Sequence, residues 1–319
     1  MRKIFHILIL VTLTLMLQGC VFDDYDHCDI EYSKVWVDFD MSQCNGQEPG
    51  GMSVFLFPKA GGRPRRFEFI GSQGDYISIA PGEYSLLSYN SDTYRVVVDD
   101  YDSYDKCSFT TPSTTVFAGI GSLTRAAIPG GPPEGEETIR KEPQQMWRGY
   151  ISNVTVPPAR SDTLHITVPV VTTTAKVTVN IGPCTNLDDI SQLCGILTGT
   201  PSVQNALTLK PEGQPAAIPF SINRPNAKSD MLTGNFRIFT KTGFDRPSWL
   251  ILYIWLRDGQ KYYYKFDVTQ MMAEAPDQKN IILDLGPITV PISTGPDTPG
   301  GGMDVGVDGW DYVIIDITT

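Results

Sequence analysis

Residues 248–268 read SWLILYIWLRDGQKYYYKFDV, with an apolar run on each side of Asp258-Gly259. This dipeptide is favoured in the two-residue type I′ turn of a β-hairpin. A two-residue turn would place four aromatic side chains on one face of the hairpin: Tyr253, Trp255, Tyr262 and Tyr264. The segment therefore predicts a long antiparallel hairpin with an aromatic face.

Short segments with strand periodicity surround this hairpin. Residues 34–40 place Val35, Val37 and Phe39 on alternate positions, and residues 164–170 and 176–181 repeat the pattern. Gly and Pro separate such segments every 8–12 residues or so, a spacing typical of β-sandwiches. One exception is residues 186–197, where apolar residues three and four apart predict a short helix.

The 319 residues suggest about two domains. The stretch 127–143 is rich in Pro and Gly and is expected to form an exposed loop of the first domain, with the boundary at 157–160. We therefore expect an all-β chain with two tandem β-sandwiches and Greek-key-type connections, residues 34–158 and 159–292. Net charge is −11, from 25 basic and 36 acidic side chains, which disfavours binding to nucleic acid.

The first twenty residues predict export and a lipid anchor. A basic head and an apolar run over 4–17 have the length of a signal-peptide core. Leu17-Gln18-Gly19-Cys20 resembles a bacterial lipobox, in which the signal, residues 1–19, is removed and Cys20 carries acyl chains such as palmitate. The acidic start of the tether, residues 20–33, resembles a surface-export signal. We expect a lipoprotein of the outer membrane that is exposed on the cell surface.

Five other cysteines invite disulfide pairing, the default in an oxidising compartment. Cys184 and Cys194 lie close together in the sequence and form a candidate disulfide. Only two of Cys28, Cys44 and Cys107 can pair with each other, so one is left without a partner, and which one stays open. No CxxC spacing is present, so no metal site is expected.

The end of the chain combines a flexible linker with a strand. Residues 293–302 (STGPDTPGGG) are rich in Gly, Pro and small polar residues, and the following strand pattern predicts a role in completing a sheet. The residues expected to complete the sheet are Val305, Val307, Trp310, Val313, Ile315 and Ile317. Whether this strand folds back on its own chain or reaches a neighbour stays open.

Two further clusters have two interpretations each. Residues 99–105 contain four carboxylates, which could bind calcium or form a solvated acidic loop. The aromatic hairpin face could stack against sugars or could fill a core. For catalysis the sequence offers little, since Gly119-Ile120-Gly121-Ser122-Leu123 does not match GxSxG and His165 has no marked partner. No catalytic residue and no cofactor are predicted.

Several motifs resemble the two-domain fimbrillin superfamily of Bacteroidetes, particularly its lipoprotein anchor and minor-subunit branch. They are the lipobox, residues 51–58 (GMSVFLFP), residues 79–84 (IAPGEY) and residues 307–313 (VDGWDYV). The resemblance implies two transthyretin-like domains and an outer-membrane lipid anchor.

The resemblance also implies assembly by donor-strand exchange with other fimbrial subunits. The arginine at which polymerising members are cleaved has no convincing counterpart, which favours an anchor or accessory subunit. We thus predict a non-catalytic fimbrial anchor or accessory subunit in cell adhesion. The alternative is a surface lipoprotein that binds a glycan or a host ligand.

Overall fold

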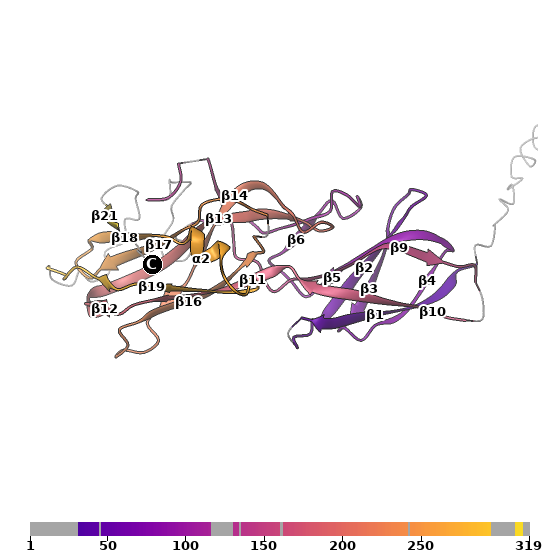
Figure 1. The fold of residues 1–319 in the computed structure, drawn as a ribbon, viewed down its shortest axis with the longest axis horizontal. Coiled ribbons are helices and arrows are strands. Elements are labelled where there is room, and N and C mark those ends of the chain that lie inside the picture. The colour runs from indigo at the N-terminus through magenta and orange to yellow at the C-terminus, as the bar shows by residue number, and fades with distance from the viewer. Residues whose placement is uncertain are drawn as a thin grey trace, which may run out of the picture.

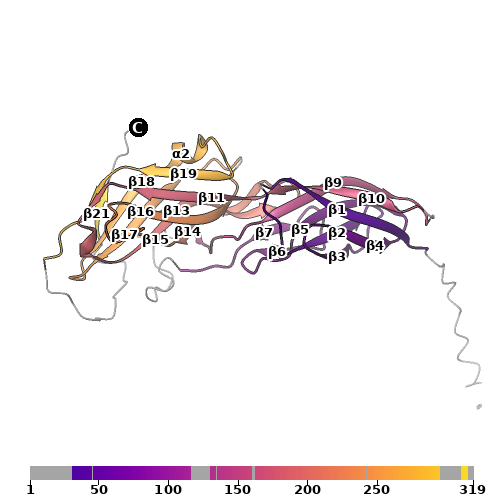
Figure 2. The ribbon, with the colours of Figure 1, turned by 90° about the horizontal axis from the view of Figure 1, so that it is seen from below.

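The computed structural model describes residues 31–44, 46–115, 130–133, 135–159, 162–241, 243–294 and 310–314. It consists of strands with one short helix, arranged as two elongated β units placed end to end (Figure 1). Figure 2 shows the same two units from below, again lying end to end. The expected all-β fold is confirmed.

The first unit is built on a seven-stranded sheet in the order β3-β2-β5-β9-β10-β1-β4. The strands are β1 Ser33–Gln43, β2 Gly51–Pro58, β3 Arg65–Ile70, β4 Asp75–Ile79, β5 Gly82–Asn90, β9 Trp147–Val156 and β10 Leu164–Thr172. Neighbours are antiparallel except β1 and β10, which are parallel. β9 and β10 pair through only three residues each, so the sheet folds into two layers at that point.

The alternation of apolar and polar residues along these strands explains how the two layers pack against each other. Val35 and Val37 of β1 face a core that also receives Val54 and Leu56 of β2. β2 is buried along nearly its whole length because its other face, with Phe55 and neighbouring aromatics, enters a second cluster. A strand buried on both faces reads as a continuous apolar run.

The second unit packs a four-stranded sheet, β15-β16-β11-β19, against a larger sheet containing β21-β18-β17-β13-β14-β8. The strands of the first are β11 Thr174–Ile181, β15 Ile222–Asn223, β16 Leu232–Phe239 and β19 Asn280–Leu285. Those of the second are β8 Thr138–Ile139, β13 Ile190–Asn205, β14 Pro211–Phe220, β17 Trp249–Leu256, β18 Lys261–Asp267 and β21 Trp310–Ile314. Between the sheets lies the inner core, to which Val177, Phe236 and Leu252 belong.

Small elements complete this unit. β12 Cys184–Thr185 pairs with β20 Ile288–Thr289, and α2 Thr269–Ala273 follows β18. The helix expected over 186–197 was a wrong prediction. Only the 3-10 turn Leu187–Asp189 is helical, and Ile190 begins the 16-residue strand β13. Of the apolar residues three and four apart, Leu187 lies in this turn and the others lie in β13, which is buried on both faces from Cys194 onward; there spacing no longer distinguishes helix from strand.

The two units share strands and a core. β6 Val97–Asp99 and β7 Ser108–Thr110 come from the sequence of the first unit, yet β7 pairs with β13 of the second. A joint core forms where they meet, and its buried members are Phe55, Phe57, Leu87, Tyr89, Val96, Cys107, Phe109, Met146, Ala206 and Phe239. The ring of Phe109 contacts that of Tyr89 edge to face, with centroids 5.7 Å apart.

Sheet membership also changes the expected division of the chain. β10 was assigned to the second domain, but it pairs with β1 and β9 in the first sheet. The boundary expected at 157–160 therefore falls in the sequence between β9 and β10, two strands of the first unit, and the chain passes into the second unit between Thr172 and Thr174. The stretch 127–143, expected to be an exposed loop of the first domain, includes β8, which pairs with β14 of the second unit.

Candidate functional site: a sheet edge closed by the C-terminal strand

The candidate site is the edge of the large sheet at β18. β21 lies parallel to β18, with Lys261 opposite Trp310 and Lys265 opposite Ile314. The C-terminal strand therefore folds back onto its own chain and closes this edge. Of the residues expected to complete the sheet, Trp310 and Val313 lie in β21. The other four, Val305, Val307, Ile315 and Ile317, lie outside the described residues.

Side chains on both faces hold β18 in place. On the inner face Tyr264 is fully buried and donates its hydroxyl hydrogen to the Thr289 carbonyl oxygen at 2.7 Å. On the outer face the Lys265 ammonium lies 4.1 Å from the centroid of the Trp249 ring, and partial burial lowers the pKa of this lysine. These contacts hold β18 without involving β21.

This arrangement can perform one kind of chemistry. A strand at a sheet edge presents unpaired backbone N–H and C=O groups, and any added strand of suitable register can satisfy them. β21 comprises five residues, so it contributes only a few backbone hydrogen bonds, each stabilising by about 1 kcal/mol. A pairing this short can be exchanged for a longer one.

The hairpin register differs from the prediction by one residue. Tyr253 lies opposite Tyr263, and Trp255 lies opposite Lys261. Three residues, not two, form the turn, because Gly259 has φ +85° and the Leu256 N–H bonds to the Gln260 carbonyl oxygen. A type I turn followed by a residue in the left-handed region is the usual three-residue hairpin loop.

The expected aromatic platform is therefore wrong. Tyr253 and Trp255 face the outer side of the sheet, whereas Tyr262 and Tyr264 face the inner core. Exposed fractions are 0% for Tyr253 and Tyr264 and 2% for Trp255, which leaves no ring surface on these three for a sugar. The segment that leads from Gly130 into β8, here called the crossing segment, covers the outer face: Ile139 packs on it, and Gly130 lies against the Tyr263 ring.

The candidate disulfide between Cys184 and Cys194 is also wrong, because both are free thiols. Cys184 belongs to the inner core, while Cys194 lies on the outer face opposite Tyr253. The large sheet separates them, so their nearness in sequence brings no contact. Burial raises the pKa of Cys194 to about 12 and keeps it a thiol. Cys44 and Cys107 are likewise free and buried, whereas Cys20 and Cys28 lie outside the described residues.

The acidic stretch 99–105 forms turns between β6 and β7. The Ser103 hydroxyl donates to the Asp105 Oδ1 at 3.2 Å, and Asp100 takes a left-handed backbone with φ +50°. Across the part of the chain that the structure describes, no three His, Cys, Asp or Glu side chains are grouped closely enough to hold a metal ion.

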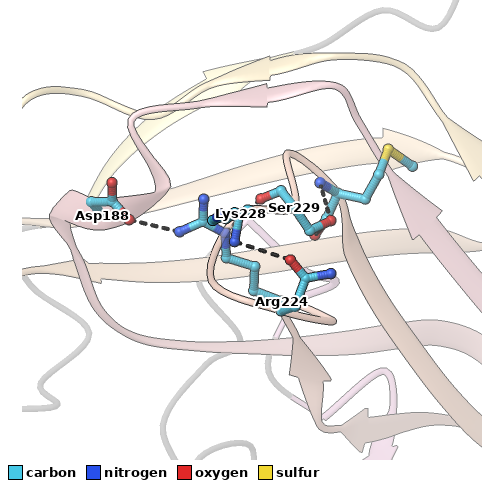
Figure 3. Close-up of polar contacts among 6 residues, drawn as sticks. Asp188, Arg224, Lys228 and Ser229 are labelled. Carbon is cyan, nitrogen blue, oxygen red and sulfur yellow. Dashed lines mark hydrogen bonds and ion pairs between the residues drawn. The ribbon is translucent and has the colours of Figure 1, made fainter.

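At the end of the second unit that is farthest from the joint, an ion pair holds one loop in place. The loop between β15 and β16 is held by Arg224, whose Nη1 lies 2.6 Å from the Asp188 Oδ1 (Figure 3). Arg224 Nε also donates to the Ser229 carbonyl oxygen at 2.5 Å. Asp188 is 89% exposed, so the ion pair orders the loop but stabilises the fold by less than about 1 kcal/mol.

One acid that the sequence analysis missed, Glu137, is partly buried where the crossing segment meets the large sheet. Glu137 Oε1 accepts the Gly199 N–H at 3.0 Å, and its Oε2 is buried without a hydrogen bond from any described residue. Burial raises the pKa of Glu137 to about 7. Nearby, burial lowers the pKa of Lys241 to about 8, and its ammonium donates to the Ser248 Oγ at 2.6 Å.

Replacing Glu137 by glutamine is expected to stabilise the chain increasingly as pH rises above about 4.5, and not at lower pH. A raised carboxyl pKa means that the folded state binds the proton more tightly, so stability falls as pH rises from about 4.5 through 7. Glu137→Gln removes this loss while retaining an oxygen for Gly199. The variant should gain about 2 kcal/mol at pH 8, a figure reduced for partial solvent access, and nothing at pH 4.

Urea unfolding at pH 4, 6 and 8 measures this difference, with the exposed neighbour Glu136→Gln as the matched control. A gain that is the same at all three pH values would show that the Glu137 carboxylate does not titrate near 7.

Relatives of known sequence place the chain in a family. Residues 19–220 match the family described as a domain of unknown function, DUF5119. The chain therefore belongs to the DUF5119 family. It is also 29% identical over 151 residues to a Bacteroides ovatus protein provisionally named fimbrium anchoring subunit Fim4B. That match covers 46% of this chain and 39% of the relative, so the chain spans well under half of that protein.

Solved structures share the fold. A provisionally named adhesin from Bacteroides ovatus superposes with a TM-score of 0.60 at 18% identity, covering 84% of this chain and 95% of that one. The fimbrial anchor protein Mfa2 from Porphyromonas gingivalis superposes with a TM-score of 0.51 at 12% identity, covering 80% and 90%. These likenesses establish the two-unit β architecture.

No helix among the described residues is long and apolar enough to cross a membrane.

Proposed function

We propose that the chain is a non-catalytic cell-surface lipoprotein that serves as an anchor or accessory subunit of a fimbria. Residues 1–19 would be the signal and Cys20 the lipid attachment point in the outer membrane. A tether over 20–33 leads to the two β units, and the linker and C-terminal strand occupy 293–319. Similarity to a relative named as a fimbrium anchoring subunit supports this role.

One observation carries the proposal: the sheet edge at β18 is closed by a short parallel strand from the end of the chain. In the proposed mechanism β21 keeps this edge closed until another fimbrial subunit supplies a longer strand. The edge then accepts the incoming strand by the same backbone pairing. Closing the edge in the free subunit also protects it from pairing with the wrong chain.

A cross-link between the two strands tests the exchange. Tyr262 lies opposite Asp311, so a short thiol cross-linker should join Tyr262→Cys to Asp311→Cys within one chain. The native thiols of Cys44, Cys107, Cys184 and Cys194 are buried and should not compete. Linked chains should no longer co-purify with fimbrial subunits from the envelope of the producing bacterium, whereas the same variant without linker should.

The control pair Lys210→Cys with Asp311→Cys should not be joined, because Lys210 precedes β14 and does not pair with β21. If linked chains assembled as well as unlinked ones, exchange at this edge would be excluded.

A further inference from the structure

A positively charged cleft lies at the joint between the two units, although the chain as a whole is acidic. Two adjoining cavities of about 340 and 200 Å³ form it and share Gln145, Lys176 and Arg237 in their walls. The first unit contributes the end of β10 and the turn after β1, and the second contributes β11, β16 and the residue before β19. The combined space is in the range of small-molecule sites.

Four basic residues from distant parts of the sequence line this cleft: Arg95, Lys176, Arg237 and Lys279. Lys176 pairs directly with Arg237 on one side and with Asn280 on the other. The Lys176 N–H donates to the Lys279 carbonyl oxygen at 2.9 Å, which places the fourth cation beside the row. Val177 and Phe236, the adjacent residues, face the inner core, so the row faces the cleft.

Acidic groups do not balance this row. Glu142 is the one acid lining the two cavities, and its Oε1 is 2.7 Å from Arg95 Nη1. Its Oε2 accepts the backbone N–H of Arg237 at 3.3 Å. Asp277 lies just outside the two cavities, and its carboxylate accepts hydrogen bonds from the Lys279 N–H and the Asn280 side-chain amide. Among the described residues no carboxylate forms an ion pair with Lys176, Lys279 or the Arg237 guanidinium.

A row of positive charges without acidic partners lowers the stability of the fold unless an anion neutralises it. Like charges directly opposite on neighbouring strands repel each other. Partial burial also strips water from Arg237 and lowers its pKa, which increases what an anion would gain there. The amides of Gln145 and Asn280 line the same walls and add neutral hydrogen-bonding groups.

We propose that the joint cleft binds a compact oxyanion through Lys176, Arg237 and Lys279. The shared chemistry is that of a free sulfate or phosphate and of the acidic group of a sugar. Arginine recognises oxyanions through its planar fork of donors, and lysine adds point charge. This site is distinct from the β18 edge, and its occupation does not depend on the proposed fimbrial role.

Calorimetric titration and thermal unfolding of the full chain at pH 7 and constant ionic strength test the site. The probes are sodium sulfate, sodium phosphate and sodium glucuronate, with sodium chloride as the reference. At least one oxyanion should bind saturably and raise the unfolding midpoint by several degrees above chloride. Tighter binding of glucuronate points to a sugar as the source, and tighter sulfate or phosphate binding to the inorganic anion.

Lys176→Gln should raise the dissociation constant at least tenfold and, without anion, should raise the unfolding midpoint because repulsion is relieved. Lys210→Gln, the same change at an exposed lysine outside the cleft, should leave the dissociation constant within twofold. Asn280→Asp, which adds a carboxylate to the row and is exposed, should likewise raise the dissociation constant, but it loses the amide hydrogen bond to Asp277, so only its anion binding is compared. The proposal would be overturned if the oxyanions raised the unfolding midpoint no more than sodium chloride does. Equal dissociation constants for Lys176→Gln and Lys210→Gln would also overturn it.

Discussion

Trp255→Ala is expected to lower the free energy of unfolding by about 3–5 kcal/mol, the usual cost of deleting a large buried aromatic. Trp255 is 2% exposed and packs on the outer face of the large sheet beside Tyr253 and Cys194. Its removal leaves a cavity beneath the crossing segment that ends in β8. Urea unfolding monitored by circular dichroism measures the loss.

The exposed aromatic Tyr94 is the control for this change. It is 76% exposed, and Tyr94→Ala should cost less than about 0.5 kcal/mol. If Trp255→Ala unfolded like the native chain and instead lost binding to a polysaccharide, the assignment of Trp255 to the core would fail and the glycan interpretation of the hairpin would return.

Phe109→Ala should lower the free energy of unfolding as much as Trp255→Ala does, and it should also change how the two units unfold. Phe109 is fully buried in the joint core, on a strand that pairs with β13. Removing the ring should lower stability by about 3–5 kcal/mol. Because contacts across the joint are what make the units unfold together, calorimetry should also show one transition separating into two.

Phe69→Ala is the matched control, since Phe69 is buried in the core of the first unit alone. It should destabilise that unit without weakening the joint. A single cooperative transition in Phe109→Ala, unchanged in width, would contradict the view that this ring couples the two units.

Local patterns predicted the strands well because side-chain alternation is a local property. Val35, Val37 and Phe39 are all buried on one face, as their spacing indicated. The boundary after residue 158 was misplaced because β10 is held by long-range pairing with β1, which no local pattern reports. The hairpin register failed through a single residue, since Asp258-Gly259 suits both a two-residue and a three-residue turn.

The candidate sites show the same limit more sharply. A strand at the chain end was predicted, but its partner, β18, is fixed only by tertiary structure. The disulfide prediction used nearness in sequence, whereas a sheet separates Cys184 from Cys194. The basic cleft was missed because Arg95, Lys176, Arg237 and Lys279 are isolated cations in the sequence, and only strand pairing brings them together.

The parallel pairing of β1 and β10 has a mechanical consequence. β1 begins at Ser33, at the end of the first unit far from the joint, and β10 ends at Thr172, where the chain enters the second unit. A pull between the tether and the second unit draws these two strands in opposite directions along their length. Their hydrogen bonds then share the load in shear and must break together, so the ladder that joins the ends of the first unit resists tension instead of unzipping.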